Sequence, residues 1–151
     1  MPKITPFLWF DGQAKGATDF YLSIFRNSKL ISTMPGPNGT VMGTTFELEG
    51  QLFHTLNGGP QYTFTPAISM FISVETQQEV DDLWTKLLAG GGRENRCGWL
   101  QDKYGLSWQV VPTVLPRLLG DKDRAKADRA MQAMLKMNKI DIATLQKAAD
   151  G

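Results

Sequence analysis

The chain has little cysteine and little net charge, and each shortage excludes a class of protein. Cys97 is the only cysteine among 151 residues, so no internal disulfide and no cysteine-based zinc site can form. Sixteen Lys and Arg residues stand against 15 Asp and Glu residues, a net charge of +1. A nucleic-acid-binding protein normally needs a larger basic excess to neutralise phosphates, so we expect no nucleic-acid partner.

Long hydrophobic runs are also missing. No apolar stretch approaches the roughly 20 residues of a membrane span, and the start Met1-Pro2-Lys3-Ile4 has no signal-peptide pattern. We therefore expect a soluble, cytoplasmic protein without membrane contact. Hydrophobic residues make up 42% of the chain and charged residues 21%, a composition typical of a globular domain with a real core.

The first half of the chain shows a β-α-β-β-β pattern. An apolar strand is predicted at 4–10, followed by Asp11 as the expected N-cap of a helix whose apolar residues recur at helical spacing from Ala17 to Phe25. Three further strands are predicted at 30–34, 41–48 and 52–56. The last two are joined by a turn at Glu49-Gly50.

The same order of elements restarts at Ile68. A strand at 68–74 leads into Thr76 and Glu79, which form a capping box for a second helix. Short strands follow near Arg93, at 97–102 and at 106–111. We therefore predict an α+β fold in which two βαβββ modules, residues 1–59 and 67–112, form one domain as a curved mixed sheet with an open cup. Residues 113–151 are predicted as a C-terminal helical extension, which packs either on its own sheet or on a partner subunit.

Strand alternation places a candidate site on the side of the sheet away from the helices. Along each strand, the wholly apolar set of alternate side chains packs under the helices. The other set, which mixes polar and aromatic residues, lines the concave side. A small-molecule pocket needs such an aromatic surface with a few polar groups. We expect Thr5, His54, Ser69 and Gln109 to converge near the pseudo-twofold axis. The candidate ligand-binding residues are Thr5, Phe7, Trp9, His54, Ser69, Phe71, Trp99 and Gln109.

Several stretches make the sequence similar to a known family. They are Phe10-Asp11-Gly12 through Phe20-Tyr21 and Phe25, Asn57-Gly58-Gly59-Pro60, the tail Met137-Asn138-Lys139-Ile140-Asp141-Ile142, and, as the most specific piece, Cys97-Gly98-Trp99-Leu100-Gln101-Asp102-Lys103-Tyr104-Gly105-Leu106-Ser107-Trp108-Gln109. With them the chain resembles the vicinal oxygen chelate (glyoxalase/bleomycin-resistance/dioxygenase) superfamily over nearly its whole length. The closest resemblance is to the PhnB-like branch, often labelled 3-demethylubiquinone-9 3-methyltransferase-like.

The resemblance implies a homodimer, because such folds often pair halves across subunits. It also implies where a metal would sit: metal-dependent members use His or Glu at positions that correspond here to Thr5, His54, Ser69 and Gln109. Only His54 is a strong transition-metal ligand, so we expect no bound metal and no cofactor. The sequence does not support the methyltransferase label, because Rossmann-type S-adenosylmethionine enzymes need a glycine-rich turn after the first strand. The segment Gly12-Gln13-Ala14-Lys15-Gly16 resembles such a turn only loosely.

Three functions remain open from the sequence, and so does the question whether any reaction is catalysed. The first is a metal-independent small-molecule-binding protein. The second is an enzyme on a small polar or aromatic metabolite, with His54 as acid/base and Gln109 as a polariser. The third is a regulatory or interaction module whose cup is filled by its own aromatic residues. The structural alternatives are a partly buried, hydrogen-bonded histidine for His54, a buried thiol for Cys97, and a hydrogen bond between Gln109 and Ser69.

Overall fold

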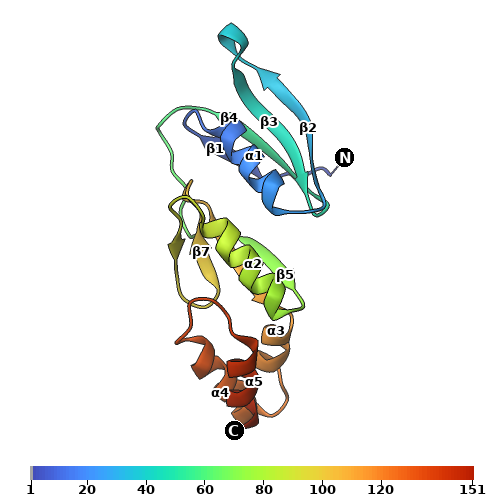
Figure 1. The fold of residues 1–151 in the computed structure, drawn as a ribbon, viewed down its shortest axis with the longest axis vertical. Coiled ribbons are helices and arrows are strands. Elements are labelled where there is room, and N and C mark those ends of the chain that lie inside the picture. The colour runs from blue at the N-terminus through green and yellow to red at the C-terminus, as the bar shows by residue number, and fades with distance from the viewer. Residues whose placement is uncertain (1) are drawn as a thin grey trace. The chain divides into compact units, whose positions relative to one another are not determined.

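The structure is a computed structural model that describes residues 2–151. The chain divides between Thr63 and Phe64 into two compact units, and each unit is described by itself. Each unit contains one βαβββ module, and three further helices follow in the second (Figure 1). The predicted α+β class, with two modules and C-terminal helices, is confirmed. That the two modules form one domain over residues 1–112 stays a prediction.

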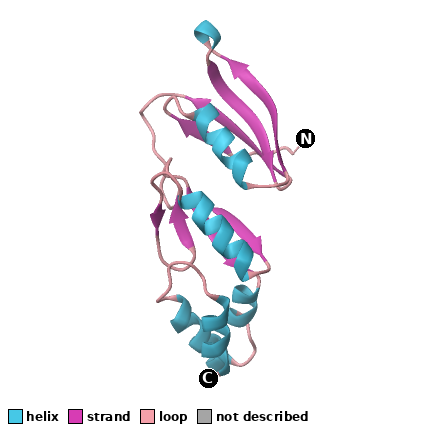
Figure 2. Ribbon diagram, in the orientation of Figure 1, coloured by secondary structure: helices cyan, strands magenta, loops and turns pink. Residues whose placement is uncertain are grey.

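The first unit is a four-stranded mixed sheet with one helix on one face (Figure 2). The strand order is β1-β4-β3-β2, with β1 parallel to β4 and the other pairs antiparallel. Its elements are β1 (Phe7–Phe10), α1 (Ala14–Ile24), β2 (Ser28–Pro35), a short 3-10 helix (Pro37–Gly39), β3 (Val41–Leu48) and β4 (Gln51–Asn57).

The first strand starts later than predicted, at Phe7 and not at Ile4. Pro6 has no N–H to give to the ladder, although its carbonyl still accepts a hydrogen bond from the backbone N–H of His54 at 3.0 Å. Ile4 is exposed, and Thr5 lies just before the strand. The prediction that Thr5 belongs to this strand is therefore wrong, because it lies two residues before β1.

Helix α1 receives its N-cap from a distant strand. The prediction that Asp11 caps this helix is wrong, because the N-cap position is Gln13 and its side chain makes no capping bond. The side-chain oxygen of Asn57, at the end of β4, accepts from the backbone N–H of Ala14 at 2.9 Å. The amide of Asn57 donates in turn to the carbonyl of Val41 at 3.1 Å. Asn57 thereby ties the helix to two strands of the sheet.

The second unit repeats this topology, with strand order β5-β8-β7-β6 and β5 parallel to β8. The predicted capping box is confirmed, since Thr76 accepts from the N–H of Glu79 while the Glu79 carboxylate accepts from the N–H of Thr76. The elements of the module are β5 (Met70–Val74), α2 (Gln77–Leu88), β6 (Arg93–Glu94), β7 (Trp99–Gln101) and β8 (Ser107–Pro112).

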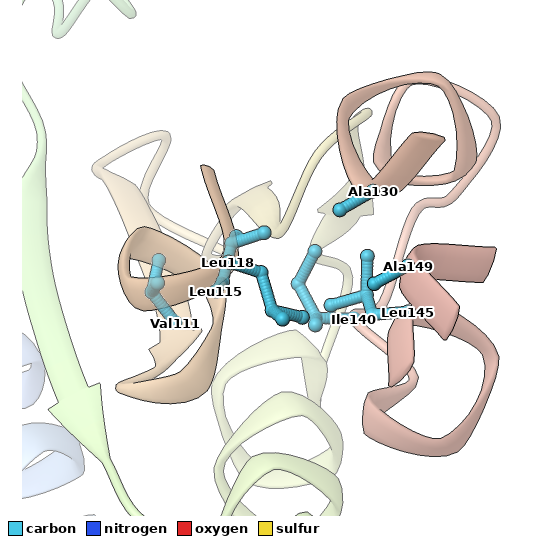
Figure 3. Packing of buried hydrophobic residues seen from close by; sticks show 7 residues of the cluster. All are labelled: Val111, Leu115, Leu118, Ala130, Ile140, Leu145 and Ala149. Carbon is cyan, nitrogen blue, oxygen red and sulfur yellow. The ribbon is translucent and has the colours of Figure 1, made fainter. Parts of the chain in front are cut away.

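The C-terminal extension packs within the second unit and forms its own apolar cluster. It contains α3 (Val114–Leu119), α4 (Arg124–Met134) and α5 (Ile142–Asp150). Figure 3 shows the cluster, to which the last strand contributes Val111 and the extension contributes Leu115, Leu118, Ala130, Ile140, Leu145 and Ala149. Among the described residues, no helix is both long enough and apolar enough to span a bilayer.

The extension is also hydrogen-bonded to the module. Gln77, in the first turn of α2, donates to the carbonyl of Ile140 at 3.0 Å and accepts from the N–H of Ile142 at 2.8 Å. One turn further along α2, the Asp81 carboxylate pairs with Lys139 at 2.9 Å. The open question of the sequence is thus answered: the extension packs on its own chain.

Candidate ligand-binding site

His54 lies on the helix-free face of the first sheet, between two strands. It is directly opposite Phe7 on β1 and Thr45 on β3. Its Nδ1 shares a hydrogen bond with the Thr45 hydroxyl at 2.8 Å, and its ring centroid lies 6.3 Å from that of Phe7. Among the described residues, Nε2 has no hydrogen-bond partner. The imidazole is therefore held in place at one nitrogen and available at the other.

A hollow of about 150 Å³ opens beside this imidazole. Phe7 and Met34 on its wall are 57% and 53% exposed, so the hollow is accessible and presents apolar surface beside its hydroxyl groups and the imidazole. Pockets for drug-sized ligands are larger, about 300–1,000 Å³, so this hollow suits a small group such as a single ring. The residues that line it are Phe7, Ser32, Thr33, Met34, Thr44, Thr45, His54 and Thr55.

Trp9 lies on the same face as Phe7, but its indole ring is in contact with the linker that follows β4. Its indole N–H donates to the carbonyl of Gly59 at 2.9 Å, and its ring meets Tyr62 edge-on at 5.1 Å between centroids. Gly58 packs so closely that a Cβ there would lie 2.2 Å from the indole ring. Trp9 and Thr5 do not line the hollow.

The four candidates of the second unit come together on one face of its sheet. Phe71 and Trp99 are both directly opposite Gln109, on either side of it. The amide of Gln109 donates to the Ser69 hydroxyl at 2.9 Å, so these two side chains partner each other. Phe71 is 57% exposed. Convergence of Thr5, His54, Ser69 and Gln109 at one point stays a prediction.

The candidate side chains of neither sheet fit a transition metal. Within residues 2–151, no three His, Cys, Asp or Glu side chains are grouped so that they could hold an ion. His54 supplies one imidazole, and Gln109 and Ser69 bind each other. Zinc and similar ions take three or four strong ligands from protein, which this set does not provide.

Six residues that line the hollow were missed from the sequence: Ser32, Thr33, Met34, Thr44, Thr45 and Thr55. Thr45 is the most important, because it orients the His54 ring. The register of β3 against β4 would have identified Thr45, since the turn at Glu49 and Gly50 places it opposite His54.

Comparison with known proteins places the chain in a family. The family described as 3-demethylubiquinone-9 3-methyltransferase matches residues 2–111. The PhnB protein from Bacillus cereus, provisionally described as such a methyltransferase, is 36% identical over 74% of this chain and 100% of its own, with a TM-score of 0.69. No curated protein matches the chain significantly.

More distant structures share the fold alone. A protein from Pseudomonas aeruginosa is 18% identical over 74% of this chain and 98% of its own, with a TM-score of 0.62. The fosfomycin resistance protein FosX from Listeria monocytogenes is 15% identical over 74% of this chain and 93% of its own, with a TM-score of 0.55. The resemblance seen in the sequence is thus confirmed for residues 2–111, whereas the tail at 137–142 lies outside the family match. The chain belongs to the 3-demethylubiquinone-9 3-methyltransferase-like family, the PhnB-like branch of the vicinal oxygen chelate superfamily.

Proposed function

We propose that this chain binds a small organic molecule on the helix-free faces of its sheets and needs no transition metal to do so. The observation that carries this proposal is the hollow beside His54, which combines an exposed aromatic ring, a thioether and an imidazole nitrogen that has no partner within residues 2–151. Apolar walls with a few oriented polar groups are the general composition of small-molecule sites.

The donor set favours a metal-free site over a metal centre. FosX from Listeria has been solved with Mn(II), whereas His54 is the sole histidine of this chain. The fold also argues against the methyltransferase chemistry of the family's description. Each sheet has a single parallel pair, so the chain offers no doubly wound parallel sheet of the kind that binds nucleotide cofactors at its strand ends.

A thermal-shift screen tests the proposal. Compounds with one ring and one or two polar groups should raise the melting temperature, because a ligand at 100 times its Kd stabilises the native state by about 2.7 kcal/mol. Ni²⁺, Zn²⁺, Mn²⁺ and Fe²⁺ should leave it unchanged. Met34→Ala should weaken binding, and Ile4→Ala, at an exposed aliphatic residue of the same unit outside the hollow, is the control.

Two outcomes would contradict the proposal. Stoichiometric metal in protein purified without chelator, lost on His54→Ala, would restore metal-dependent chemistry. A screen in which no organic compound changes the melting temperature would leave the hollow without a binding function.

A second candidate function is an enzyme that uses His54 as acid or base. The hydrogen bond from Thr45 favours it, because a general base needs a fixed ring and one accessible nitrogen. A ligand found in the screen would be incubated with the protein and its turnover followed by NMR. Turnover lost in His54→Gln with binding retained would support catalysis, and binding without turnover in the native protein would exclude it for that compound.

The third candidate, a cup filled by its own aromatic residues, is less well supported. Phe7 and Phe71 are both 57% exposed, which favours an open face over a filled one.

We also propose a homodimer. The outer edge of β2 has no neighbouring strand in its sheet, and Leu30, Ile31 and Met34 along it are exposed. Sedimentation equilibrium would show a dimer, and a monomer at 100 times the concentration of the binding assays would refute it.

A further inference from the structure

We propose that the helix-free face of the second sheet recognises a carboxylate, and that Arg93 and Gln101 hold a small planar carboxylic acid there. The inference rests on the proposed function, because it names the ligand class for the second unit. It adds three residues, Arg93, Gln101 and Ser107, that the family's metal positions do not include.

The register of the sheet places these three residues side by side. Arg93 on β6 is opposite Gln101 on β7, and Gln101 is opposite Ser107 on β8. Opposed residues point to the same face, and neighbouring strands lie about 4.8 Å apart. The three side chains therefore form one polar row across the sheet.

The neighbouring residue shows which face the row occupies. The Glu94 carboxylate accepts a hydrogen bond from the indole N–H of Trp84, on α2, at 2.8 Å. Glu94 thus points toward the helix, together with the fully buried Leu100 opposite it. Because successive residues of a strand alternate, Arg93 points to the helix-free face.

An aromatic row runs beside the polar one. Trp99, Gln109 and Phe71 are aligned across β7, β8 and β5, two residues and about 6.6 Å along the strands from the polar row. The other three tryptophans, Trp9, Trp84 and Trp108, donate their indole N–H to a protein oxygen. Among the described residues the N–H of Trp99 has no such acceptor, so it is a donor available to a ligand.

The charge of this face favours an anion. Arg93 is exposed and makes no ion pair among the described residues. No carboxylate shares the face within the strands, whose remaining side chains there are Phe71, Ser73, Trp99, Gln101, Ser107 and Gln109, with Val111 at the end that the extension covers. A positive group without a negative neighbour raises the local concentration of anionic ligands.

A buried hydroxyl adds an independent observation. The Ser107 side-chain oxygen is inaccessible to solvent and has no hydrogen-bond partner in the part of the chain that the structure describes. Buried polar atoms are nearly always hydrogen-bonded, and those that are not require an explanation. A ligand oxygen beside Gln101 would supply the missing partner once the side chains that cover the hydroxyl move apart.

Planar carboxylic acids match both rows. The guanidinium of Arg93 fits a carboxylate with two parallel hydrogen bonds, and the Gln101 amide can donate a third. A ring attached to that carboxylate would extend toward Phe71 and Trp99, where it can stack. The face offers donors and aromatic surface, and so favours an aromatic acid over its neutral amide.

The test uses benzoate, benzamide and inorganic phosphate as probes of the full-length protein. Each is titrated at low ionic strength, and the indole N–H signal of Trp99 is followed by ¹H–¹⁵N NMR after assignment with Trp99→Phe. Benzoate should shift this signal and bind at least 10-fold more tightly than benzamide or phosphate. Arg93→Gln should weaken the binding of benzoate at least 10-fold. Arg26→Gln, which removes the same charge from an exposed position of the first unit, should change it less than 2-fold.

The outcomes separate this inference from the proposed function. Equal affinity for benzoate and benzamide, equal loss in the two arginine variants, or phosphate binding as tight as benzoate would each overturn the carboxylate site. The proposed function would still stand if neutral compounds raised the melting temperature in the same protein. Absence of binding by every organic compound would overturn both.

Discussion

Replacing Ile140 by alanine tests how strongly the extension stabilises the second unit. Ile140 is fully buried in the cluster that joins α3, α4 and α5 to Val111 of β8 (Figure 3). The substitution removes three carbon atoms, and at about 0.8 kcal/mol for each buried carbon the transfer term is about 2.4 kcal/mol. The cavity left behind raises the expected loss to about 3–4 kcal/mol, within the range of about 2–5 kcal/mol for such truncations.

Urea denaturation followed by tryptophan fluorescence would measure this loss. The second unit carries Trp84, Trp99 and Trp108, whereas the first carries only Trp9, so the signal reports mainly on the unit that changes. With a slope of about 1–3 kcal/mol per molar urea, a loss of 3 kcal/mol lowers the midpoint by about 1–3 M. Circular dichroism at 222 nm would be recorded in parallel, because the two units need not unfold together.

Ile68→Ala is the control, since it makes the same chemical change in the same unit at a side chain that is 61% exposed. Its effect should stay below about 1 kcal/mol, as for most surface substitutions. If Ile140→Ala costs no more than this control, the apolar cluster does not stabilise the second unit and the reasoning fails. Ile140→Val should cost about 0.5–1.5 kcal/mol, which checks that the loss scales with the volume removed.

Three further predictions concern polar contacts. Asn57→Ala removes the cap of α1 and should cost about 1–2 kcal/mol, seen as faster amide hydrogen exchange in that helix. Thr44→Val removes the hydroxyl that bridges two other buried threonines and should cost about 1–3 kcal/mol in urea denaturation. Hydrogen bonds from Gln77 and Lys139 lower the pKa of Asp81, so its contribution is present above the ordinary pKa of about 3.9 and is lost as pH falls through the lowered value. Asp81→Asn should abolish that part of the pH dependence of the denaturation midpoint. The effect should be small, because the carboxylate is half exposed. A pH profile identical to that of the native protein would refute this contribution of Asp81.

Local chemistry explains why much of the fold could be predicted. The turn at Glu49 and Gly50, both at positive φ, fixes the register of β3 against β4. Each step away from this two-residue turn pairs one residue of β3 with one residue of β4, so the sequence numbers of every opposed pair have the same sum as 49 and 50. The contact between Thr45 and His54 therefore follows from the turn alone, and it was missed because the two strands were considered separately.

Contacts between distant segments could not be predicted in this way. Asp11 is a good N-cap by residue type, but the cap of α1 comes from Asn57, 43 residues after the N–H that it accepts from. Asn57 reaches that N–H because β4 runs parallel to β1 and ends beside the start of the helix. Helix α3 lies within the predicted helical extension, but its bounds could not be read from the sequence because Pro116 interrupts the apolar pattern. A proline in the first turn of a helix nevertheless loses no hydrogen bond.

The extension shapes the candidate site even though it lies outside the family match, which ends at residue 111. The loop before β7 is held by two bonds to it: Cys97 N–H donates to the carbonyl of Met137 at 2.8 Å, and Gly98 N–H to that of Asn138 at 2.7 Å. Gly98 has a φ of +82°, and a Cβ there would lie 3.0 Å from the side chain of Ile140, so only glycine fits. The next residue is Trp99. The Bacillus cereus relative is aligned over its full length with only 74% of this chain, so the placement of this indole depends on a segment that family membership alone does not supply.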